Sequence, residues 1–214
     1  MTGNRHAHQH AHRRRRADDE QHHHRSRYDP RYRAHMVRVL PGEYYTTRTD
    51  GEMVVTVLGS CVAACIRDPR TGYGGMNHFM LPESTSGDWN GSNASMRYGN
   101  YAMEALINDV LKSGCSRQDL EIKLFGGANV AGQSNVGTKN AAFALRYLEN
   151  EGLRVVAQDL GGMHGRRIHY VPSTGKVQRV LLKRAADVAV IEEERQYQSK
   201  LHSAPVEGTI ELFE

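Results

Sequence analysis

Met53-Val-Val-Thr-Val-Leu-Gly-Ser-Cys-Val-Ala-Ala-Cys-Ile-Arg67 is the stretch that decides the fold, because two apolar runs flank a central Gly-Ser-Cys. Runs of this length that are rich in valine predict two strands, Met53–Leu58 and Val62–Arg67. Two more runs of this kind lie outside the stretch, separated from it by Pro-Gly, Asp-Gly and Asp-Pro pairs: Met36–Leu40 and Gly75–Leu81. The first part of the chain is therefore predicted to be rich in strands.

Helical patterns follow these strands. Apolar residues recur at helical spacing from Tyr101 to Leu111 and from Ala141 to Leu148, and a glycine comes soon after each run. Further strands are predicted at Leu120–Phe125, Leu153–Gln158, Arg167–Val171 and Val177–Leu182. Too few helices separate the early strands to supply the crossovers of a doubly wound parallel sheet. This order of elements predicts an α+β fold.

The 214 residues suit one domain with appendages. Residues 1–35 contain eight of the twelve histidines and nine arginines against four acidic residues, but almost no large aliphatic residue, so we expect a disordered, solvated tail. Metal capture by its histidines, or attraction to nucleic acid, is the alternative. The domain is predicted over residues 36–190, and an acidic and polar tail over residues 191–214.

The formal charge of +4 is concentrated in the first 35 residues, so the folded part is not predicted to be basic. The longest apolar stretches fall far short of the roughly 20 residues that span a bilayer. The N-terminus has no apolar segment of the kind found in signal peptides, so we expect a cytoplasmic protein. Its three cysteines are too few for a disulfide framework and predict free thiols.

Cys61 is the candidate nucleophile. Gly59 lets the chain turn sharply between two strands, and at such a turn backbone N–H groups can face a substrate carbonyl beside the thiol. A buried structural thiol is the alternative, because free cysteine is among the most buried residue types. Cys65 lies among apolar residues and is predicted to belong to the core, while Cys115 has no neighbour in sequence that would activate it.

His78 is the candidate base. Strand alternation places Met76, His78 and Met80 on one face, so the imidazole would be partly desolvated and neutral. A neutral imidazole can accept the proton of a thiol. Two glycine-rich stretches resemble phosphate loops, Gly126-Gly127-Ala-Asn129 and Gly132–Lys139. Neither has the required spacing or residue order, so we predict no nucleotide site.

Several blocks occur in the order found in one family: Leu40-Pro-Gly-Glu-Tyr-Tyr45, Leu58-Gly-Ser-Cys-Val62, Gly74-Gly-Met-Asn-His-Phe-Met-Leu-Pro82, Arg97-Tyr-Gly-Asn-Tyr-Ala-Met103, Lys123-Leu-Phe-Gly-Gly-Ala128, Asn140, Asp159-Leu-Gly-Gly162, Arg166 and Gly175-Lys-Val177. From about Met36 to Arg184 the chain resembles the chemoreceptor glutamine deamidases of the CheD family. The resemblance implies a mixed β-sheet sandwich flanked by helices, related to bacterial toxin deamidases.

The resemblance also implies the chemistry. A CheD protein hydrolyses particular glutamines of methyl-accepting chemotaxis receptors to glutamate, without cofactor or metal, and its relatives also bind a CheC-type phosphatase. Cys61 would be the nucleophile and His78 the base. We expect Gly59, Ser60 and Asn77 to form the oxyanion and substrate site.

One position departs from the family pattern. The family's third catalytic residue, a threonine six residues before the cysteine, falls on Val55 here, while Thr56 is one residue later. A shift by one residue reverses the face of a strand side chain. We expect a bulge near Gly59 to direct Thr56 toward His78; otherwise the position is held by Val55 and the threonine is lost.

Two other functions stay open on the sequence alone. The same cysteine and histidine would serve a peptidase or a transglutaminase-like acyl transferase. A binding module that docks to a CheC-type phosphatase without catalysis is the other possibility.

Overall fold

The structure, a computed structural model, describes residues 26–81, 94–130, 135–182, 192–197 and 199. It contains two five-stranded mixed sheets. The first has the order β1 (Ser26–Asp29), β2 (Ala34–Arg38), β4 (Glu52–Leu58), β9 (Arg166–Val171), β10 (Lys176–Leu181). The second has the order β3 (Tyr44–Thr47), β6 (Gly74–Asn77), β5 (Val62–Arg67), β7 (Glu121–Gly126), β8 (Val155–Leu160).

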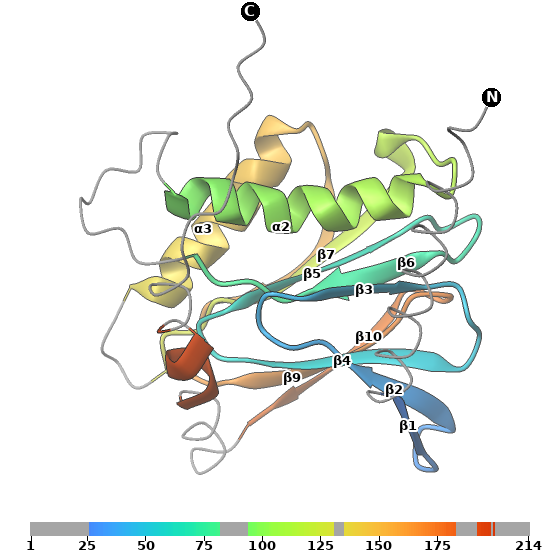
Figure 1. Cartoon of the computed structure of the whole chain (residues 1–214), viewed down its shortest axis with the longest axis horizontal. Coiled ribbons are helices and arrows are strands. Elements are labelled where there is room, and N and C mark those ends of the chain that lie inside the picture. Colours follow the sequence, from blue (N-terminus) through green and yellow to red (C-terminus); the bar gives the residue numbers. More distant parts are fainter. Residues whose placement is uncertain (1–25, 82–93, 131–134, 183–191, 198, 200–214) are drawn as a thin grey trace, which may run out of the picture.

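The elements form three layers. Helices α2 (Ala94–Leu111) and α3 (Val136–Asn150) cover one face of the second sheet, and the first sheet lies on its other face (Figure 1). A short 3-10 helix, Arg117–Asp119, precedes β7. The pairs β2–β4 and β7–β8 are parallel, and the remaining strand pairs are antiparallel. The predicted α+β sandwich is confirmed.

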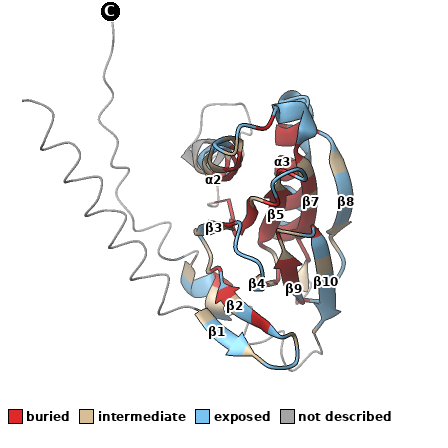
Figure 2. Cartoon of the chain, turned by 90° about the vertical axis from the view of Figure 1, so that its right-hand side faces the viewer, coloured by how far each residue is buried: buried red, intermediate tan, exposed pale blue. Residues whose placement is uncertain are grey.

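Strand β5 is apolar without alternation because both of its faces are buried. Val62, Ala64 and Ile66 pack under the helices, whereas Ala63 and Cys65 belong to the core between the two sheets. A strand buried on both faces needs apolar residues at every position. Figure 2 shows the resulting buried interior, with exposed residues on β1, β8 and β10 around it. Within this frame, the turn between β4 and β5 passes from one sheet to the other.

The ends of the domain differ from the sequence prediction. Strand β1 and the first residues of β2 lie within residues 26–35, which the composition assigned to the tail. A helical turn is present at residues 192–197, within the predicted C-terminal tail. Residues 1–25 and 200–214 lie outside the described residues. Among the described helices, none is both long enough and apolar enough to cross a membrane.

Candidate active site

Cys61 lies in the turn that connects β4 to β5, and the turn is held by its carbonyl groups. Ala128 N donates to the carbonyl of Gly59 at 2.8 Å, and Gly127 N donates to the carbonyl of Cys61 at 2.7 Å. The side chain of Asn140, from α3, donates to the carbonyl of Ser60 at 2.9 Å. With three carbonyls fixed in this way, the N–H groups of the same turn are free to face the opposite side.

A glycine is needed where β7 approaches this turn. Gly126 has a φ of 110°, and a Cβ placed there would lie 2.2 Å from the carbonyl oxygen of Cys61. A larger residue at position 126 would therefore push the turn that carries Cys61 away from β7. The Gly126-Gly127 pair thus supports the turn that carries Cys61.

The three N–H groups of the turn converge on one carboxylate. Gly59 N and Cys61 N each donate to Oε1 of Glu194 at 2.9 Å, and Ser60 N donates to Oε2 at 2.8 Å. The hydroxyl of Ser60 also donates to Oε2, at 2.6 Å. Successive backbone N–H groups of this kind form an anion-binding nest. A nest beside a thiol is suited to stabilise the oxyanion formed when the thiol attacks a carbonyl.

Thr56 and His78 bring the two sheets together at this point. Thr56 Oγ1 lies 2.8 Å from the carbonyl oxygen of Val39, to which it donates, and 2.8 Å from Nδ1 of His78. A hydroxyl has one proton, so its oxygen accepts from Nδ1–H of the imidazole. This fixes the tautomer in which Nε2 carries the lone pair, and Nε2 has no hydrogen-bond partner among the described residues.

Burial controls the charge of both groups. His78 is buried, which lowers its pKa from 6.5 to about 4, so the imidazole is neutral at neutral pH. Burial raises the pKa of the Cys61 thiol, and the neighbouring Glu194 carboxylate raises it further. A neutral thiol therefore lies beside a neutral base while the carboxylate is in place.

Cys61, His78 and Glu194 form the one cluster of potential metal ligands found among the described residues. One ligand atom from each lies within 4.8 Å of the others. The carboxylate of Glu194, however, already accepts four hydrogen bonds, which is about its full capacity. The N–H and O–H groups that surround this carboxylate suit an anion or a carbonyl oxygen. The cluster therefore does not fit a cation.

The predicted site residues do not all meet. Cys61, His78, Thr56, Gly59 and Ser60 come together. The β4–β9 register is unbroken from Val54 to Leu58, so no bulge within these residues directs Thr56 toward His78. Asn77 points elsewhere: its side chain accepts from Ala64 N at 2.8 Å and donates to the carbonyl of Ala102 at 2.9 Å. Asn77 therefore does not reach the nest, and it anchors β5 to α2.

Two residues of the site were missed by sequence reasoning. Asn140 was noted as part of a family block but was given no role. Glu194 lies 133 residues beyond Cys61 and stands within a run of acidic residues that is typical of a solvated tail. Cys65 is fully buried between the sheets, as its apolar surroundings in the sequence predicted. Cys115 is buried under the helices.

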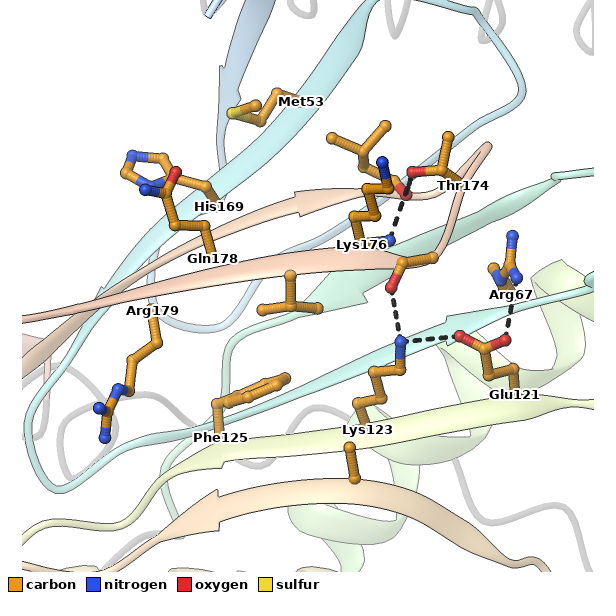
Figure 3. Close-up of a pocket in the computed structure, with 14 residues that line it drawn as sticks. Met53, Arg67, Glu121, Lys123, Phe125, His169, Thr174, Lys176, Gln178 and Arg179 are labelled. Carbon is orange, nitrogen blue, oxygen red and sulfur yellow. Dashed lines mark hydrogen bonds and ion pairs between the residues drawn. The ribbon is translucent and has the colours of Figure 1, made fainter.

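A separate hollow of about 780 Å³ is lined by residues of β4, β5, β7, β8, β9 and β10 (Figure 3). Three of its charged groups pair with one another, since Glu121 contacts both Arg67 and Lys123 at 2.9 Å. Its lining includes neither Cys61 nor His78. The candidate nucleophile and the candidate base therefore lie outside this hollow.

Comparison with known proteins gives a consistent picture. A family model described as CheD chemotactic sensory transduction matches residues 80–180. A Rhodopseudomonas palustris (strain BisA53) protein named "Probable chemoreceptor glutamine deamidase CheD" is 51% identical over 212 residues, covering 98% of this chain and 100% of that protein. A protein of the same name from Methylobacillus flagellatus is 47% identical over 87% of this chain and 93% of that protein. Another, from Bordetella petrii, is 54% identical over 74% of this chain and 70% of that protein.

Proposed function

This chain belongs to the CheD family, and from that premise we propose that it hydrolyses glutamine side chains of methyl-accepting chemotaxis receptors to glutamate, with Cys61 as nucleophile. The observation that supports this most directly is the nest of three N–H groups beside Cys61 and His78. An amide carbonyl oxygen placed in the nest would bring its carbon to the thiol.

In the first step, Nε2 of His78 takes the proton of Cys61 and the thiolate attacks the carboxamide carbon. Negative charge then develops on the carbonyl oxygen, where Gly59 N, Ser60 N and Cys61 N donate to it. Thr56 holds the imidazole so that its free nitrogen faces the thiol. A positioning role, rather than a catalytic one, follows for Thr56.

In the second step, the imidazolium of His78 protonates the amide nitrogen and ammonia leaves, which gives a thioester on Cys61. A water molecule then loses a proton to His78 and attacks the thioester. The products are glutamate and the free thiol, so each turnover consumes one water and releases one ammonia. The same nest binds the carboxylate of the product.

The test is the intact mass of a receptor cytoplasmic fragment after incubation with the enzyme. We expect a gain of about 1 Da per modified glutamine, the change from amide to acid. Cys61→Ala should give no gain, and Cys65→Ala is the matched control, because it removes a neighbouring thiol outside the reaction. Peptide cleavage or incorporation of an added amine would instead indicate a peptidase or an acyl transferase.

Two expectations from the sequence remain predictions. The first is binding to a CheC-type phosphatase, which a pull-down with folded Cys61→Ala protein would test separately from catalysis. The second is a cytoplasmic location, where the receptor helices that carry the glutamines would be accessible. Loss of the cellular effect in Cys61→Ala with phosphatase binding intact would argue against a docking role alone.

A further inference from the structure

The helical turn at residues 192–197 lies against the β4–β5 turn that contains Cys61, although the two are far apart in the sequence (Figure 1). Glu194, in its middle, is 7% exposed, although an acidic residue is rarely buried. Its carboxylate fills the nest that the proposed mechanism assigns to the substrate carbonyl. A glutamate in this position has the chemical form of the product of glutamine deamidation.

Two other residues of the 192–197 turn, Glu193 and Tyr197, also contact the rest of the protein. Glu193 forms an ion pair with Arg38, at 2.8 Å. The hydroxyl of Tyr197 is hydrogen-bonded to that of Tyr98, on α2. Tyr197 also packs against the core between the sheets as a partly buried side chain. The turn is thus held at three points and not by its carboxylate alone.

Two glycines make room for this turn. A Cβ at Gly59 would lie 2.9 Å from Oε2 of Glu194, and a Cβ at Gly42 would lie 2.5 Å from the hydroxyl of Tyr197. Residues three apart lie on the same face of a helix, so positions 194 and 197 point into the protein together. The surface from Gly59 to Gly42 is therefore shaped for one face of a helix.

We propose that residues 192–197 occupy the seat of the substrate helix and that Glu194 is a built-in mimic of the glutamate product. The inference rests on the proposed function. It also specifies the substrate: a helix that carries the target glutamine, an acidic residue just before it to meet Arg38, and an aromatic or large apolar residue three positions after it. A substrate helix must displace the chain's own turn before it can react.

The mimic also keeps the nucleophile unreactive. A carboxylate beside Cys61 disfavours the thiolate, whereas the neutral carboxamide of a substrate does not. Exchange of the turn for a substrate helix thus removes a negative charge from the nest and supplies an electrophile. Both effects favour attack after substrate binding and not before it.

The decisive experiment converts the mimic into a substrate. In the variant Glu194→Gln, Cys61 should attack the new carboxamide and water should release it as glutamate with loss of ammonia. Peptide mass analysis of the full-length protein is expected to find acid at position 194, about 1 Da heavier than the encoded amide. The same variant combined with Cys61→Ala should retain the amide.

Two controls are available within the same turn. Glu193→Gln places an amide one residue away, outside the nest, and should keep it. Gln196 is a glutamine of the natural sequence with an exposed side chain, and it should also remain an amide. Conversion at either of these positions to the same extent as at position 194 would contradict a specific seat.

Failure of this inference is distinguishable from failure of the proposed function. An unconverted E194Q protein, together with normal mass gain of a receptor fragment by the parent enzyme, would overturn the seat and leave the function intact. Conversion of E194Q with no change in the receptor fragment would uphold the seat and overturn the receptor as substrate.

A second measurement does not depend on E194Q folding as the parent does. Glu194→Ala removes the mimic, so kcat/KM for the receptor fragment should rise. A rise of about 10-fold corresponds to a seat that is open about one tenth of the time in the parent. An unchanged or lower kcat/KM in this variant would contradict occupation of the substrate seat.

Discussion

The hydroxyl of Thr56 is the part of the site whose contribution can be measured most cleanly. Thr56→Val keeps the shape of the side chain but removes the oxygen that lies 2.8 Å from both Nδ1 of His78 and the carbonyl oxygen of Val39. An unsatisfied buried polar group costs about 1–3 kcal/mol. Because two groups lose this partner, the free energy of unfolding should fall by up to about 6 kcal/mol.

The effect on catalysis should be separate from the loss of stability. Without the hydroxyl the imidazole loses both its orientation and its fixed tautomer, and such a change lowers activity by about 10- to 100-fold. The pH dependence of kcat should also change, because the neutral base is no longer held by its partner. Receptor deamidation at several pH values, with chemical denaturation alongside, measures both effects.

Two further substitutions complete this test. Thr56→Ser restores the hydroxyl and should recover most of the activity. Val55→Thr adds a hydroxyl at the family's usual position, but Val55 lies on the opposite face of β4, so no gain is expected. Full activity and an unchanged pH profile in Thr56→Val, or a gain in Val55→Thr, would refute the positioning role.

The remaining predictions concern the nucleophile, the nest and acid stability. Cys61→Ala should abolish deamidation, whereas Cys65→Ala should retain it and lower the free energy of unfolding by about 1 kcal/mol, measured by denaturant titration. Gly59→Ala should lower kcat/KM, because its Cβ would lie 2.9 Å from the carboxylate oxygen of Glu194, where the substrate oxygen must sit. The pKa of His78 is lowered from 6.5 to about 4, so between these values the unfolded chain binds the proton first. The free energy of unfolding should therefore fall by up to about 3 kcal/mol as the pH is lowered through this window, and His78→Gln should remove most of that dependence.

The fold was predictable where the sequence pattern reflects burial. Val62–Arg67 was predicted with its observed bounds, because a strand covered on both faces leaves a continuous apolar run. Strands β1 and β3 were missed, since they are short and carry arginine, tyrosine or threonine with much of their surface exposed. The predicted strand Gly75–Leu81 ends early, at Asn77, because the side chain of Asn77 takes the place of a ladder carbonyl and accepts from Ala64 N, although Phe79 still forms a bridge with Val62.

The site was predictable only in part, for a physical reason. Cys61 and His78 belong to motifs with local features: a glycine turn and an apolar strand. Glu194 has no such feature, because Glu192 and Glu193 precede it and nothing in the sequence distinguishes the buried carboxylate from its neighbours. A contact between residues 133 positions apart depends on the tertiary fold. The side chain of Asn77 does not reach the nest, because neighbouring strand residues face opposite sides.

The nest has two consequences that cannot be separated. Donors that stabilise a developing oxyanion also bind a carboxylate, so an effective oxyanion hole in a deamidase has affinity for its own product. A carboxylate in the nest raises the thiol pKa, as Glu194 does, and a product carboxylate there would disfavour the reverse attack in the same way. Glu194 adds the same group from the chain itself, at a high effective concentration. Only a partner that is held at several points, as the 192–197 turn is held by Arg38 and Tyr98, can replace it. Selectivity for a helical receptor segment over a free glutamine then follows from this competition, because a free amino acid can fill the nest but cannot displace the rest of the turn.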